Sequence, residues 1–209
     1  MNSRRAESFS DGVFAVAITV LVFNLLPIGS HVPLTLKLLG GFWPSYFAYA
    51  VSFLTIGIMW VNHHGMLAQI TRVDRPLLML NLLLLLGVVA LPFPTALVAG
   101  HLTAKPGGGQ LAVVVYGLNM IAISVTFGAT WVYLTRHAYQ LGGSSHLPRQ
   151  TRSTLRFTGG NLGYVAGTLI AAFASAVAGL VIFGLLGVYY VFEHLPSPAP
   201  GSDGAADDS

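Results

Sequence analysis

The sequence contains no cysteine and very little charge. Without cysteine it has no disulfide framework, no thiolate chemistry and no thiol-based metal site. Only 8% of its 209 residues are charged, whereas soluble domains carry about 25%. In contrast, 54% of the residues are hydrophobic and the mean hydropathy is +0.71. These values predict a polytopic membrane protein.

Motifs of the common enzyme and cofactor classes are also missing. The sequence has no glycine-rich phosphate loop, no His-Glu-x-x-His and no Gly-x-Ser-x-Gly. His63, His64 and Asp11 do not favour a metal site, because adjacent histidines on a helix point about 100° apart. Basic patches interleaved with aromatic residues are absent, which argues against a nucleic-acid partner. We therefore expect neither an enzyme nor a cofactor.

The first hydrophobic run predicts a membrane-spanning helix. Residues 9–28 are about twenty residues, enough to cross a hydrocarbon core of roughly 30 Å. Ser8 and Ser10 are good caps for the start of this helix, and Pro27 and Gly29 are expected to end it.

One acid, Asp11, lies inside this run, and no other hydrophobic segment of the chain contains a carboxylate. If Ser10 caps the helix, Asp11 falls in the first turn, where a negative charge suits the helix dipole. An acid at the edge of a membrane helix is costly unless it is paired, so it indicates a functional site. The alternative is an interfacial capping residue paired with Arg5.

The same helix carries an apolar stripe. Val16, Val20 and Phe23 are spaced i, i+4 and i+7, and Thr19 borders them. From the residues alone, such a stripe ordinarily packs against lipid or neighbouring helices.

Further hydrophobic runs predict six spans in an all-α protein. Residues 157–192 are too many for one span. We therefore expect two short spans there, separated by a turn near residues 175–179. Pro92 and Pro94 are expected to kink the third span. The membrane domain is predicted to cover residues 1–195, and residues 196–209 form a tail whose composition indicates disorder. The second to fourth spans are expected at 42–62, 77–98 and 111–134.

The positions of the basic residues predict an orientation. Six spans place both termini on one side of the membrane. The opposite loops contain only Lys37 and Lys105 as basic residues. By the positive-inside rule the arginine-rich side is cytoplasmic, and the plasma membrane is the expected location. The arginines collected on that side are Arg4, Arg5, Arg72, Arg75, Arg136, Arg149, Arg152 and Arg156.

This topology predicts a polar network between the first and second spans. The first helix begins on the cytoplasmic side and the second ends there, so the two polar groups of residues share one depth. A network of Arg5, Asp11 and one of the two histidines would lower the cost of a partly buried acid. The alternative is that the histidines only face lipid headgroups. The residues at this depth are Arg5, Ser10 and Asp11 on the first helix, and Trp60, Asn62, His63 and His64 on the second.

Two blocks of the sequence resemble a known family. Arg5 is followed by Phe9-Ser10-Asp11 and then Gly-Val-Phe-Ala, and residues 52–64 end in Trp60-x-Asn-His-His. The first block resembles the FSD signature on the first helix of the transmembrane protein 175 family, the lysosomal potassium channel family. The second resembles its second helix, and the shorter bacterial members are the more similar.

The resemblance implies a potassium-permeable leak channel that preferentially conducts potassium, its permeant ion, and needs no cofactor. In the family the first helices surround the pore and large apolar residues form constrictions, whose positions fall here on Val16, Val20 and Phe23, with Thr19 beside them. This sequence has valine where leucine or isoleucine is more usual at the first ring. A single repeat implies a homotetramer, whose partners are its own copies and membrane lipid.

Two alternatives to a channel remain open from the residues. Asp11 and the two histidines could form a proton relay in a proton- or ion-coupled transporter. Transporters commonly show internal repeats and interrupted helices, and neither is visible in the sequence. The third class is a scaffold protein that carries no flux.

Overall fold

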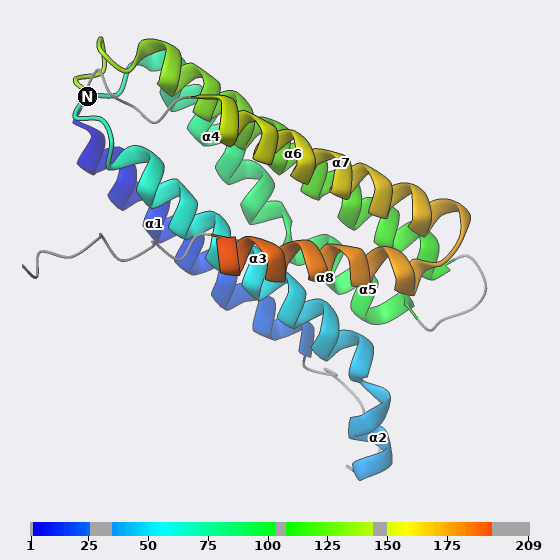
Figure 1. Ribbon diagram of the computed structural model, residues 1–209. Coiled ribbons are helices and arrows are strands. Elements are labelled where there is room, and N and C mark those ends of the chain that lie inside the picture. The colour runs from blue at the N-terminus through cyan, green and yellow to red at the C-terminus, as the bar shows by residue number, and fades with distance from the viewer. Residues whose placement is uncertain (1, 26–34, 103–107, 144–149, 194–209) are drawn as a thin grey trace, which may run out of the picture.

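The computed structural model describes residues 2–25, 35–102, 108–143 and 150–193. Within these ranges the chain is all helical, as the sequence predicts (Figure 1). Pro27, Gly29 and the predicted tail 196–209 lie outside the described residues. The elements are α1 Ser3–Val20, the 3-10 helix η1 Leu21–Leu25, α2 Leu36–Gly41, α3 Trp43–Leu67, α4 Arg75–Ala90, α5 Pro92–His101, α6 Gly108–His137, α7 Gln150–Phe173 and α8 Ala176–Glu193.

Four helical stretches of the described chain are long and apolar enough to cross a membrane. They are Ser3–Leu25, Trp43–Leu67, Arg75–His101 and Gly108–His137, which correspond to the first four predicted spans. After them α7 and α8 pack against each other as an antiparallel pair, and Ala176–Tyr190 of α8 is a shorter apolar helix.

The start of the first helix differs from the prediction. α1 begins at Ser3, where the side chain of Asn2 accepts a hydrogen bond from the Arg4 amide. Ser8 and Ser10 therefore lie inside the helix, and their hydroxyls donate to the carbonyls one turn earlier. The prediction that Asp11 occupies the first turn is wrong, because Asn2 supplies a cap two turns upstream.

Other helix boundaries also move into predicted loops. α3 continues to Leu67, so His63 and His64 lie within the helix, and α7 begins at Gln150, before residue 157 where the fifth span was predicted to begin. The short helix α2 occupies part of the first loop. Only residues 174–175 separate α7 from α8, where a turn was expected over 175–179.

The third span is interrupted at Pro92, in agreement with the predicted kink. α4 ends at Ala90 and α5 begins at Pro92, which has no amide hydrogen to donate. The Thr95 hydroxyl donates to the Leu91 carbonyl over 2.8 Å and lies 2.8 Å from the Ser52 hydroxyl. The Tyr116 hydroxyl lies 3.0 Å from that of Ser52. These buried hydroxyls join α3, α5 and α6 beside the break.

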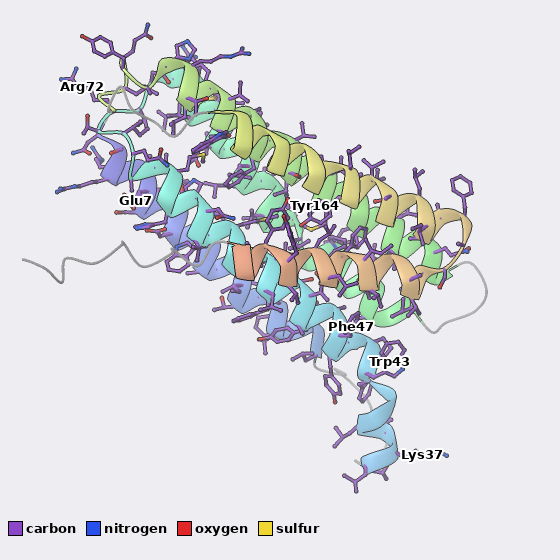
Figure 2. All side chains as sticks on the ribbon, viewed as in Figure 1. Glu7, Lys37, Trp43, Phe47, Arg72 and Tyr164 are labelled. Carbon is purple, nitrogen blue, oxygen red and sulfur yellow. The ribbon has the colours of Figure 1, made fainter. Side chains whose placement is uncertain are left out.

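The N-terminus and two interhelical connections lie together at one end of the molecule. The Ser3 hydroxyl donates to the Ile70 carbonyl over 2.8 Å, and the Thr71 amide donates to the Leu141 carbonyl over 3.1 Å. Figure 2 shows Glu7 and Arg72 at this end and Lys37 near the opposite end. The arginines at the start of α1 and in the connection between α3 and α4 therefore lie at the same end of the molecule. The predicted topology requires this arrangement.

Small residues allow close helix packing around α6. This helix contacts α4, α5, α7 and α8. A side-chain carbon added at Gly117 would lie 2.1 Å from the Thr168 hydroxyl and 2.9 Å from the Phe183 ring. Glycine at this position thus permits α6 to approach α7 and α8 more closely than any other residue would.

We expect Gly117→Ala to destabilise the fold. The added methyl group would force α6 away from α7 and α8, and overpacking of this kind costs about 1–3 kcal/mol. The measurement is the thermal unfolding midpoint of the purified protein in detergent. Gly128→Ala is the matched control on the same helix, because a carbon added there meets nothing within 4 Å. Equal midpoints for both variants would contradict the close approach at Gly117.

Candidate functional site

One face of α1 is buried and anchors this helix to the rest of the chain. The helix packs against α3 and α4, on the flank of the bundle. Its buried residues recur every three or four positions, which is the spacing of one helical face. They are Ser3, Ala6, Ser10, Phe14 and Ala17, followed by Leu21 in η1.

The opposite face of α1 is exposed and apolar, and it contains the predicted constriction residues. The side chains of Val16, Val20 and Phe23 are 62%, 38% and 60% exposed, respectively. Thr19 is exposed beside them, and its hydroxyl donates to the Val16 carbonyl. Phe9 of the FSD signature is also exposed, on the same helix. The structure therefore places the whole stripe away from the hydrophobic core of the chain.

A buried hydrogen-bond chain joins three helices at the level of the FSD signature. The Asn81 amide on α4 donates to the Ser10 hydroxyl over 3.0 Å. The Asn81 carbonyl oxygen lies 2.7 Å from Nε2 of His63 on α3. All three side chains are buried, and Phe14 packs against the His63 ring with 5.4 Å between ring centroids. Buried polar groups of this kind fix the rotation of each helix relative to its neighbours.

Asp11 has a different partner from the predicted one. The indole nitrogen of Trp60 donates to the Asp11 carboxylate over 2.9 Å. Nδ1 of His64 lies 2.7 Å from the Glu7 carboxylate, while Arg5 is exposed. In the described chain, α1 is thus joined to α3 by Asp11–Trp60 and Glu7–His64, and no hydrogen bond or ion pair links Asp11 to Arg5 or to a histidine.

Two members of this site, Glu7 and Asn81, were missed from the sequence. Glu7 precedes Asp11 by one helical turn, so the two carboxylates share a face once the helix is known to begin at Ser3. Asn81 is the one polar residue within a run of leucines in α4, and a polar residue in such a run signals a buried partner.

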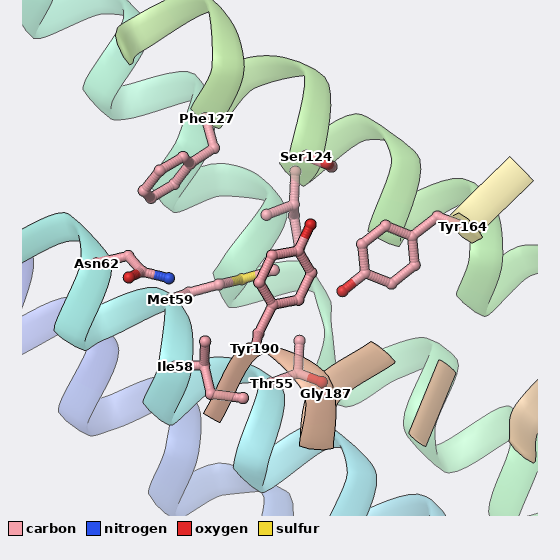
Figure 3. Close-up of a pocket in the computed structure, with 10 residues that line it drawn as sticks. Thr55, Ile58, Met59, Asn62, Ser124, Phe127, Tyr164, Gly187 and Tyr190 are labelled. Atoms are coloured by element: carbon pink, nitrogen blue, oxygen red, sulfur yellow. The ribbon is translucent and has the colours of Figure 1, made fainter. Parts of the chain in front are cut away.

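Asn62, by contrast, lies apart from the network. It faces a cavity between α3 and the later helices (Figure 3). Within the described ranges no three histidine or carboxylate side chains converge as metal ligands. The arrangement around α1 accordingly provides hydrogen-bonded anchors on one face and an unoccupied apolar surface on the other.

We expect Asn81→Leu to be more destabilising than Trp60→Phe. The first change leaves the Ser10 hydroxyl and the His63 ring buried without their shared partner, which costs about 1–3 kcal/mol for each group. The second removes a bond that is accessible to solvent and headgroups. Thermal unfolding midpoints in detergent measure both effects. Adding Ser10→Ala to Asn81→Leu should cost less than the sum of the single changes, since the residues are coupled. Strict additivity, or a larger loss for Trp60→Phe, would contradict the buried chain.

Comparison with known proteins gives the sequence and the fold clear relatives. Residues 5–92 match the family described as endosomal/lysosomal potassium channel TMEM175. A potassium channel of Streptomyces collinus is 45% identical over 197 residues, which cover 94% of this chain and 95% of that protein. The mouse endosomal/lysosomal proton channel TMEM175 is 25% identical over 194 residues, covering 85% of this chain but 38% of the longer mouse protein.

A solved structure agrees with these sequence matches. The crystal structure of a lysosomal potassium-selective channel TMEM175 homolog from Chamaesiphon minutus superposes with a TM-score of 0.76 at 30% identity, covering 91% of this chain and 97% of that one. The resemblance inferred from the FSD signature and the Trp-x-Asn-His-His block is therefore confirmed, and the chain belongs to the TMEM175 family of ion channels.

Proposed function

We propose that this chain is the subunit of a potassium-permeable cation channel, with α1 lining the ion path. The observation that carries the proposal is the exposed apolar face of α1. A helix on the flank of the bundle that is anchored on one side only could face its copies around an axis. Potassium is proposed as the conducted ion because relatives of the chain are described as potassium channels.

The proposed assembly is a homotetramer of six-span subunits in the plasma membrane, with both termini cytoplasmic. The four long apolar stretches and the α7–α8 pair would supply the six spans. The cytoplasmic orientation rests on the arginines, which follow the positive-inside rule. A single repeat in the chain favours four copies, and self-association within lipid is the only partnership that the proposal needs.

The proposed mechanism uses narrowness and dewetting. Rings of Val16, Val20 and Phe23 offer no ligands to a cation that must shed water, so they would resist permeation until the path widens or fills with water. Thr19 would contribute a hydroxyl between the rings. Asp11–Trp60, Glu7–His64 and the buried Asn81 chain would hold α1 at a fixed angle, and this angle sets the width of each ring.

The polarity of the Val16 ring is expected to control conduction. Val16→Asn or Val16→Thr should raise the potassium conductance several-fold and reduce the discrimination between potassium and sodium, because a polar side chain hydrates the ring. Val16→Phe should lower conductance by narrowing it. The measurement is current across a planar bilayer containing purified protein, with paired potassium and sodium gradients.

Ile18→Thr is the control for the Val16 variants, because Ile18 is half-buried and packs against the subunit core. It should reduce stability with little effect on the reversal potential. If Ile18→Thr shifts the reversal potential while the Val16 variants do not, the proposal that the Val16 face of α1 lines the ion path is wrong. Saturable flux driven by a proton gradient would instead favour a coupled transporter.

Accessibility of the same face provides an independent prediction. Since the chain contains no cysteine, single-cysteine variants need no background changes. In Val16→Cys and Phe23→Cys channels, a water-soluble cationic thiol reagent should block most of the current. Ile18→Cys channels should be insensitive. Block of Ile18→Cys alone would show that the opposite face of α1 lines the path.

A further inference from the structure

A cavity inside the subunit lies away from the exposed face of α1. It has a volume of about 60 Å³ and lies between α3, α6, α7 and α8. Thr55 and Tyr164 form its buried part, and the half-buried Asn62 lies nearer its opening. Figure 3 shows the Asn62 amide and the Tyr164 hydroxyl directed toward the space between them. None of this space is used by the proposed ion path.

Three polar side chains at this cavity have no hydrogen-bond partner in the described chain. They are the amide of Asn62 and the hydroxyls of Ser124 and Tyr164. Thr55 has its own partner, because its hydroxyl donates to the Val51 carbonyl over 2.7 Å. Within a membrane span, a polar group with no hydrogen-bond partner is unfavourable. Tyr164 is buried and Asn62 and Ser124 are half-buried at this partly open cavity, so a small occupant with a hydroxyl group could bond to all three.

The remaining walls define the chemistry of that occupant. Ile58, Met59, Ile123 and Phe127 supply apolar surface opposite the polar groups. None of the lining residues is ionised at neutral pH, so a charged ligand would have no counter-charge. The volume corresponds to about four water molecules, by the space that one buried water requires. A neutral molecule of a few heavy atoms, with one hydroxyl on a short apolar chain, matches these limits.

We propose that this cavity is a binding site for short-chain alcohols. The alcohol hydroxyl donates to one of the oxygens of Asn62, Ser124 or Tyr164 and accepts from another, and the alkyl chain lies against Met59 and Phe127. Water would bond to the polar groups but would also lie against the apolar walls. An alcohol bonds to the same groups and covers those walls with its alkyl chain, so its displacement of water is favourable.

A diazirine analogue of butanol tests the site on the purified full-length protein in detergent. After illumination, mass spectrometry of the peptides should locate adducts on cavity residues of α3, α6 and α8, and excess 1-butanol should suppress them. Ser124→Leu fills the cavity and should abolish these adducts. Tyr164→Phe keeps the cavity shape but removes one hydroxyl, and should weaken competition by 1-butanol roughly two- to tenfold, the loss of one hydrogen bond.

Tyr46→Phe is the matched control, since Tyr46 is an exposed residue of α3 that does not line the cavity. It should leave the adduct pattern unchanged. Adducts confined to exposed lipid-facing side chains would overturn the site, because they would report partitioning alone. An absence of cavity adducts, or adducts unaffected by both Ser124→Leu and Tyr164→Phe, would equally overturn it and leave water as the occupant. The readout is covalent labelling, so it is independent of whether the chain conducts potassium.

Discussion

Asn81 connects three helices within an apolar environment, and the position of α1 depends on this connection. Its amide group is shared between Ser10 on α1 and His63 on α3. In a membrane interior, apolar contacts between helices do little to select one rotation over another, because lipid tails are equally apolar. A buried amide with two specific partners does make that selection. It fixes which face of α1 is turned inward.

Because one face of α1 is fixed against the other helices, the residues on its opposite face are exposed at the surface. With Ser10, Phe14 and Ala17 buried, Val16 and Phe23 are left on the surface. A large apolar side chain at the surface is ordinary for a membrane protein, so exposure alone does not assign a role. The assignment gains weight from the position of α1 on the flank of the bundle and from the relatives of the chain. In the proposed channel, this stripe would form the rings that narrow the ion path.

The two halves of the subunit are held by different kinds of contact. Around α1, polar side chains make specific bonds to α3, such as Asp11–Trp60 and Glu7–His64. Around α6, glycines such as Gly117 allow close van der Waals packing against Phe183 and Thr168. Between these regions lies the cavity bounded by Asn62 and Tyr164, where neither kind of contact is complete. In the proposed alcohol site, this incomplete packing would give the ligand room to bind.

The sequence by itself determined that this is an all-helical membrane protein of the TMEM175 family. Long apolar runs, scarce charge and the FSD signature are properties of the sequence itself, and they do not depend on how the helices pack. The break at Pro92 was likewise predictable, because proline lacks the amide hydrogen that a continuous helix requires. The i, i+4, i+7 spacing also identified Val16, Val20 and Phe23 as one face, because the regular turn of a helix aligns residues at those intervals.

Only the tertiary structure decided which residues pair. The sequence placed Asp11, Trp60, His63 and His64 at one depth, yet depth does not specify the rotation of a helix about its axis. In the fold, Trp60 rather than a histidine reaches Asp11, and His63 turns inward to Asn81, a residue from a third helix. Such pairings depend on rotations and tilts that are set jointly by all the packed helices, and no local pattern in the chain records them.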